Sequence, residues 1–167
     1  MQNQKINQKN NEVKLQLHPT WSMYFIDTLF LWIVTGVLIV LAGSDERPVA
    51  QGSMCMAAFV VLVLLYRAWY MTSVKWTVTD KQIRSEHGVF MRDVNYIELY
   101  RVVDYAEKQS FLQLIFGVKD VIIYSGDRTD PALRIYGIPN GMPVIPVIKP
   151  LVEQQKKENY VYEITNR

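Results

Sequence analysis

Cysteine and histidine, the side chains most often used in disulfides, zinc sites and acid–base catalysis, are scarce in this 167-residue chain. Cys55 is the one cysteine, so it can form no disulfide within the chain and lacks the companions that a metal site needs. His87, one of two histidines, stands beside a turn-like glycine, which favours a structural role over that of a general base. The sequence also lacks a glycine-rich phosphate loop and a nucleophile elbow. We therefore expect no enzymatic activity, no metal and no cofactor.

A large excess of either charge is also missing. The formal net charge is +2, and the part of the chain after residue 71 has 13 basic and 12 acidic residues. This balance excludes a general nucleic-acid binder and disfavours recognition of inositol lipids, which requires several cations around one pocket. Lys75, Arg84 and Arg92 are candidates for weak contact with lipid phosphates, although they serve equally well to keep strand surfaces soluble.

Long apolar runs, in contrast, occur twice. Residues 23–42 have the length of about 20 residues that crosses roughly 30 Å of hydrocarbon, and a second run covers residues 54–71. The polar segment GSDERPVAQG between them is typical of a tight turn. A signal peptide is the alternative for the first run, but polar residues precede it, no small-residue cleavage pattern follows it, and a second run comes at once. The pattern predicts an N-terminal tail over residues 1–21 and a transmembrane helical hairpin over residues 22–71.

Positive charges predict the orientation of this hairpin. Lysine and arginine flank the two apolar runs on their outer sides, at Lys5, Lys9, Lys14, Lys75, Lys81 and Arg84. The connecting turn contains only Arg47, so the positive-inside rule places both termini in the cytoplasm and the turn outside. Aromatic residues that favour the headgroup layer gather near the same boundary, at Trp21, Tyr24, Trp69, Tyr70 and Trp76.

Each apolar run contains one charged residue near its cytoplasmic end. Asp27 lies about one turn inside the first run, and Arg67 lies about one turn before the end of the second. Antiparallel helices bring both residues to the same depth, so we predict an intramembrane ion pair with a structural role. A position on an ion path is the alternative interpretation of charges inside a membrane.

From Val74 onward the apolar period changes from helical to alternating, which is typical of β-strands. Strands are predicted over residues 74–79, 82–88, 120–125 and 132–138, with two more within 89–108. A helix is expected over about 142–158, so that a second, cytoplasmic domain covers residues 72–158 and a tail covers 159–167. The predicted fold class is α+β, a two-helix transmembrane hairpin followed by a mainly antiparallel, partly open β barrel with a C-terminal helix.

The stretch KQSFLQLIFG, residues 108–117, interrupts the alternation. Ser110 is a suitable N-cap and Gly117 a suitable left-handed residue after a helix, so a short helix is expected between them. Its apolar residues are candidates for contact with a partner or the membrane: Phe111, Leu112, Leu114, Ile115 and Phe116. In one interpretation the helix plugs an open end of the barrel. In the other, Leu112 and Phe116 stay exposed and contact lipid or protein.

Several motifs follow one another in a distinctive order in the second half of the chain. They are WTVTDKQI, HGV, IELYRVVD, KQSFLQLIFGV, DVIIYS and LRIYGIPN, and LHPTW precedes the first apolar run. This order resembles the bacterial PH-like (pleckstrin-homology-like) domain family of small membrane proteins. The resemblance implies a PH-like fold over residues 74 to about 158, with two membrane helices before it and a place in the bacterial inner membrane.

These observations favour a non-enzymatic inner-membrane protein whose hairpin anchors a cytoplasmic PH-like domain. We expect that domain to bind an unidentified membrane protein or a second copy of itself in an envelope complex, through open strand edges and residues 111–116. One alternative is a weak sensor of membrane lipid. The other is an accessory subunit of a transporter or channel, with small residues for close helix contact at Gly36, Gly43, Ala57 and Ala58. No nucleic-acid partner is expected.

Overall fold

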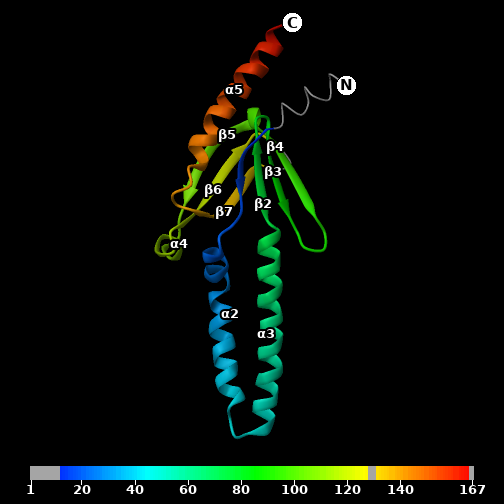
Figure 1. Cartoon of the computed structure of the whole chain (residues 1–167), viewed down its shortest axis with the longest axis vertical. Helices are drawn as coiled ribbons and strands as arrows, with labels where there is room; N and C mark the ends of the chain where they lie inside the picture. The colour runs from blue at the N-terminus through cyan, green and yellow to red at the C-terminus, as the bar shows by residue number, and fades with distance from the viewer. Residues whose placement is uncertain (1–11, 128–130, 166–167) are drawn as a thin grey trace.

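The computed structural model describes residues 12–127 and 131–165, with side chains as far as Asn159. Its elements, in chain order, are β1 (Val13–Leu17), α2 (Trp21–Ala42), α3 (Arg47–Ser73), β2 (Lys75–Thr79), β3 (Gln82–His87), β4 (Asp93–Glu98), the 3₁₀ helix η1 (Leu99–Arg101), β5 (Val102–Lys108), α4 (Phe111–Ile115), β6 (Val118–Ser125), β7 (Ala132–Pro139) and α5 (Val144–Thr165). The helix pair α2–α3 extends from one end of a β domain, and α5 projects from the other end (Figure 1). The predicted α+β fold class is confirmed.

The strands of the described residues form two antiparallel sheets that do not close into one barrel. The first sheet has the order β1-β2-β3-β4 and the second the order β5-β6-β7. The predicted strands are all present, and the stretch 89–108 contains two of them, β4 and β5, as expected. The outer strands β1, β4, β5 and β7 each pair with one strand only, so both edges of each sheet lack a neighbouring strand in the described part of the chain.

Strand β1 comes from the segment that the sequence assigns to a tail. It pairs with β2, although both helices lie between the two strands in the sequence, and Leu17 lies opposite Trp76. The tail prediction for residues 1–21 is therefore wrong for residues 13–17, because a five-residue strand has a weak local pattern and its pairing partner lies far along the chain. Lys5 and Lys9, used above for orientation, lie outside the described residues.

Helix α5 is longer than the sequence predicts. It runs from Val144 to Thr165, so the tail prediction for 159–167 is wrong as far as residue 165, and residues 166–167 lie outside the described part. Its first half packs on the domain through three buried apolar residues at helical spacing, Val144, Ile148 and Val152. Pro150 is tolerated within it, although proline removes one backbone donor.

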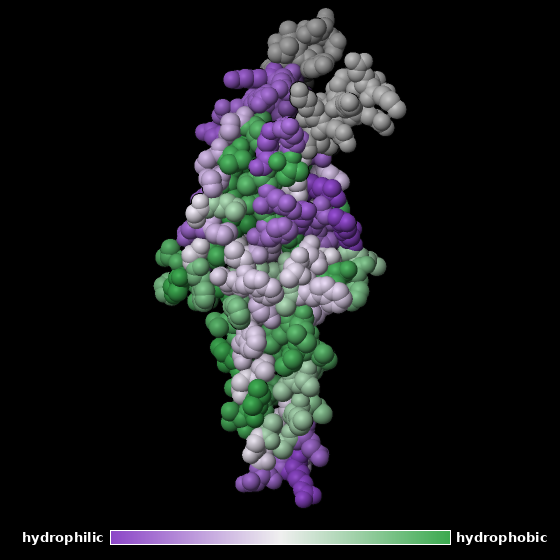
Figure 2. Space-filling view, in the orientation of Figure 1, coloured by the Kyte–Doolittle hydropathy of each residue, from purple (hydrophilic) through white to green (hydrophobic). Residues whose placement is uncertain are grey.

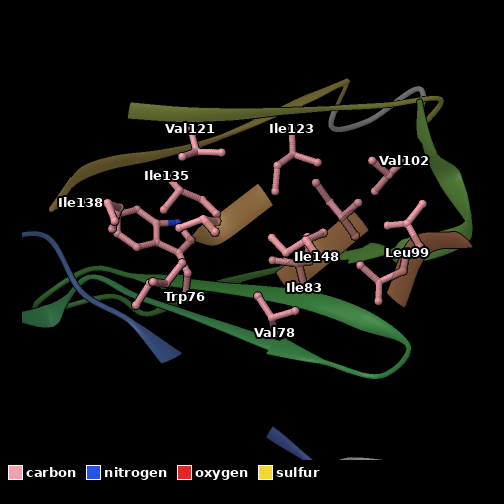
Figure 3. Close-up of a cluster of buried hydrophobic side chains, with 14 of the residues drawn as sticks. Trp76, Val78, Ile83, Leu99, Val102, Val121, Ile123, Ile135, Ile138 and Ile148 are labelled. Atoms are coloured by element: carbon pink, nitrogen blue, oxygen red, sulfur yellow. The ribbon is translucent and has the colours of Figure 1, made fainter. Parts of the chain in front are cut away.

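Apolar side chains from both sheets and from α5 meet in one core (Figure 3). Trp76 and Val78 from β2 face Val121 and Ile123 from β6, and Ile148 of α5 lies between the sheets beside Ile83. The predicted alternation on β2 is confirmed, because Val74, Trp76 and Val78 are all buried. Burial of each large aliphatic or aromatic side chain contributes about 1.5–3 kcal/mol, so this layer accounts for the closeness of the two sheets.

The helices α2 and α3 pack against each other, and most of their apolar surface faces outward. Both are long and apolar enough to cross a membrane by length and composition. Their contact contains satisfied polar groups: the Tyr24 hydroxyl donates to the Leu64 carbonyl at 3.1 Å, and Thr28 Oγ1 donates to the Tyr24 carbonyl at 2.6 Å. Of the small residues that the sequence offers for close helix contact, Ala57 is buried. Gly36 is not in such a contact, because a Cβ added there would meet nothing within 4 Å.

The helix pair joins the domain through very short connections. Residues 18–20 link β1 to α2, and Val74 alone links α3 to β2. Thr20 fixes the first connection, because its backbone N–H and its Oγ1 both donate to the Gly137 carbonyl, at 2.9 and 2.8 Å. Gly137 has φ +66°, and a Cβ there would lie 2.6 Å from Met23 Cβ. The start of α2 is therefore seated directly on β7.

Replacing Gly137 with Ala should destabilise the protein by on the order of 3 kcal/mol, because the new Cβ disfavours the left-handed backbone and overlaps Met23. The matched control is Gly117→Ala, which has φ +65° and open space around it, so its expected loss is about 1 kcal/mol. Urea unfolding in detergent micelles, followed by tryptophan fluorescence, measures both losses. Equal losses would show that α2 is not seated on Gly137.

Candidate functional site

A buried carboxylate, Asp120 on β6, lies where the domain meets the helix pair and is only 2% exposed. Its Oδ1 accepts from Gln113 Nε2 at 2.9 Å and from the Gly137 N–H at 3.0 Å. Its Oδ2 accepts from Arg134 Nε at 3.1 Å. Gln113 Nε2 also lies 3.5 Å from the sulfur of Met23. One side chain thus connects β6, β7 and α4 and, through Gln113, the first turn of α2.

This connection decides which way α4 faces. The predicted cap is confirmed: Ser110 Oγ accepts from the Gln113 N–H at 3.4 Å, and Gln113 Oε1 accepts from the Ser110 N–H at 2.8 Å. Gly117 follows in the predicted left-handed conformation, with φ +65°. Gln113, the one polar residue of α4, points inward to Asp120 and is buried. Most of the apolar residues around it therefore face outward.

The interpretation of α4 as a plug of the barrel is consequently wrong. Phe111 is 77% exposed, and three more apolar side chains are exposed beside it; we call this group the α4 patch, and it consists of Phe111, Leu114, Ile115 and Phe116. Leu112, which the second interpretation places in the exposed set, is partly buried. An apolar run flanked by a cap and a glycine predicts a helix. It does not predict that the single glutamine is the buried residue of that helix.

The turn between β3 and β4, residues 88–92, carries a second exposed apolar group that sequence reasoning missed. Phe90 is 81% and Met91 83% exposed. Gly88 has φ +111°, and a Cβ there would lie 1.8 Å from the Met91 carbonyl oxygen, so the turn is tight. We call Phe90 and Met91 the β3–β4 tip. The signal available in the sequence was two large apolar residues in a turn, where polar residues are usual.

The three cations proposed for lipid phosphates come together around one acid, Glu86 of β3. Lys75 is its cross-strand neighbour, Arg84 Nε lies 2.8 Å from its Oε1, and the Arg92 guanidinium pairs with its Oε2. The hydrogen bond from Arg92 and the nearby positive charges lower the pKa of Glu86 below its ordinary value. The group therefore has three positive charges against one negative charge, beside the β3–β4 tip.

Asp27 and Arg67 lie at matching distances from the domain, each six residues from the end of its helix. The salt bridges among the described residues do not include one between them. The two residues therefore share a level, but the predicted ion pair does not form among the described residues.

A cavity of about 260 Å³ opens between the two sheets where they do not close. Its polar lining includes His87, Asn95, Arg134 and the phenols of Tyr70 and Tyr136. Burial raises the pKa of Tyr136 to about 12, so this phenol is a neutral hydrogen-bond donor. None of the lining residues in the described part of the chain is a carboxylate, so the cavity offers donors suited to a polar or anionic group.

Removing the charge of Asp120 should loosen the junction. Asp120→Asn should destabilise the protein by about 1–3 kcal/mol, because the neutral amide keeps a single acceptor oxygen for three donors and turns an NH₂ group towards one of them. The matched control is Glu107→Gln in the same sheet, whose exposed pair with Lys119 contributes about 0–1 kcal/mol. Chemical unfolding measures both, and hydrogen exchange should increase in α4 of the first variant only. Similar effects of the two substitutions would contradict a central role for Asp120.

Comparison with known proteins matches a family model to this chain. The family model described as "Bacterial PH domain" matches residues 22–149, which include both apolar helices, every strand from β2 to β7 and the start of α5. Neither the curated proteins nor the solved structures include a match to this chain. The matched residues make up 128 of 167, well over half of the sequence. The chain belongs to the bacterial PH domain family.

Proposed function

We propose that the protein is a non-enzymatic protein of the bacterial inner membrane. In this proposal α2 and α3 cross the bilayer, and the PH domain lies at the cytoplasmic surface, where it associates with another membrane protein or a second copy. One observation carries the proposal: an apolar helix pair joins the domain directly. Three residues link β1 to α2, and one residue links α3 to β2. Such short connections hold the domain in one orientation relative to the helices.

Helix length and flanking charge support this arrangement. The 22 residues of α2 correspond to about 33 Å at 1.5 Å per residue, close to the hydrocarbon thickness of a bilayer. Lys75, Lys81 and Arg84 lie on the domain side of the helices, whereas the turn between α2 and α3 has only Arg47. The positive-inside rule then places the domain in the cytoplasm.

The acidic groups of the junction support a role without catalysis. Asp120 is occupied by Gln113, Arg134 and Gly137, and Glu86 is occupied by two arginines. A general acid or base needs access to a substrate within hydrogen-bond reach. These carboxylates instead hold structural elements together.

The open sheet edges support the association role. β4 and β5 each have an outer edge without a neighbouring strand in the described residues, and such edges pair readily with an added strand. β4 leads away from the tip near α3, and β5 leads down to α4, beside the start of α2 (Figure 1). A partner at the membrane surface therefore has access to both.

Cysteine labelling in cells tests the topology. In a Cys55→Ala background, Asp45→Cys in the turn between the helices should react with a membrane-impermeant maleimide in intact cells. Asp104→Cys on β5 should react only after the inner membrane is disrupted, because the proposal places it in the cytoplasm. The reverse labelling pattern would invert the orientation, and equal labelling of both positions would exclude two membrane crossings.

Photo-crosslinking in bacterial membranes tests the association. A benzophenone amino acid at Tyr96, on the edge strand β4, should form an adduct, since a strand added to β4 lies within reach. The matched control is Tyr124, also a solvent-accessible tyrosine but on the central strand β6. An adduct of twice the chain mass indicates self-association, and a different mass indicates another protein. Absence of an adduct at Tyr96, or equal adducts at both positions, would refute association through this edge.

A further inference from the structure

Two exposed apolar groups flank the helix pair at its junction with the domain. The α4 patch lies beside the start of α2, and the β3–β4 tip lies beside the end of α3 (Figure 1). In the space-filling view, hydrophobic surface extends outward on both sides at this level, directly above the hydrophobic surface of the helices (Figure 2). The sequence positions of the two groups are far apart, so their common level is a property of the fold.

Contacts with the helices fix both groups at this level. On one side Phe90 stacks on Tyr66, with ring centroids 6.3 Å apart, and meets the Trp69 ring edge-on at 5.9 Å. Tyr66 and Trp69 lie in the last two turns of α3, which ends at Ser73. On the other side Gln113 holds α4 against Met23, in the first turn of α2. Neither group is therefore a loosely attached loop.

We infer that the α4 patch and the β3–β4 tip form a two-sided collar that inserts into the headgroup–acyl boundary of the cytoplasmic leaflet. This inference rests on the proposed function, because it requires that α2 and α3 cross the bilayer. A bilayer that surrounds the helix pair covers both groups at once. A single protein docked on one side covers only one of them.

The surrounding residues match the chemistry of that boundary. Trp21 and Trp69 are exposed on the helices at the same level, and amphipathic rings favour the interface between hydrocarbon and water. Arg92 follows Met91 directly, and with Lys75 and Arg84 it gives the β3–β4 side three positive charges against the two negative charges of Glu86 and Asp93. Anionic headgroups complement this charge. The collar therefore combines apolar insertion with phosphate attraction.

Such a collar limits the tilt of the domain. The short connections fix the domain on the helix pair, so any tilt of the helices in the bilayer tilts the domain with them. Insertion on both sides opposes leaning in both directions, because each tilt withdraws one apolar group from lipid. The cavity between the sheets and the open edges of β4 and β5 then keep fixed heights above the bilayer.

Site-specific fluorescence on the full chain tests the collar. Single cysteines replace Met91 and Phe111 in a Cys55→Ala background, carry an environment-sensitive dye, and are reconstituted in vesicles of phosphatidylethanolamine and phosphatidylglycerol. Both positions are among the most exposed of the chain, so the substitutions remove little packing. Lipid spin-labelled near the headgroup should quench both dyes strongly, and aqueous iodide should quench them several-fold less than a control dye. The control is Val103→Cys, an apolar position 69% exposed at the start of β5.

A dye on the native Cys55 of α3 reports insertion separately. Cys55 is exposed on that helix, so lipid protection there supports the membrane crossing. If Cys55 is protected while both tips respond to iodide like Val103, the collar is refuted and the proposed function stands. Protection of one tip alone indicates a one-sided contact and also overturns the collar. An iodide-accessible Cys55 overturns the membrane crossing and the collar together.

Discussion

The pairing of Asp120 is the constraint on which the junction between helices and domain depends. A carboxylate removed from water is costly unless its oxygens accept hydrogen bonds, and here donors come from Gln113, Arg134 and the Gly137 backbone. Gln113 belongs to α4, whereas Arg134 and Gly137 both belong to β7, with Gly137 under the start of α2; Asp120 itself belongs to β6. The requirement to satisfy one buried group therefore sets the relative positions of three elements.

The same requirement reverses the usual arrangement of a surface helix. An amphipathic helix normally buries its apolar side. In α4 Gln113 is buried, whereas Phe111, Leu114 and Ile115 are exposed. This is an unfavourable arrangement in water, and it becomes favourable beside a pair of helices that themselves present apolar surface to their surroundings. The neighbouring apolar helices thus explain why apolar groups are exposed on α4 and on the β3–β4 turn.

The sequence predicts the elements whose signals are local. The alternation of Val74, Trp76 and Val78 identifies β2, and Ser110 with Gly117 brackets α4, because capping and left-handed turns involve neighbouring residues. It fails where the decisive contact is remote. Nothing near Gln113 indicates that its partner is Asp120, and nothing near Leu17 indicates pairing with Trp76. Of the site, the three cations around Glu86 were identified, whereas Phe90 and Met91 were not.

The division of the first sheet between two distant segments has a consequence for biosynthesis. Residues 18–75, which include both apolar helices, separate Leu17 from its partner Trp76. Closing so long a loop is entropically unfavourable for a disordered chain, whereas an assembled helical hairpin brings its two ends together. Strand β1 leaves the ribosome first. It can pair with β2 only after the hairpin between the two strands has formed. A complete β domain therefore requires an assembled hairpin. A chain whose hairpin does not assemble keeps an incomplete sheet, which is accessible to chaperones and proteases.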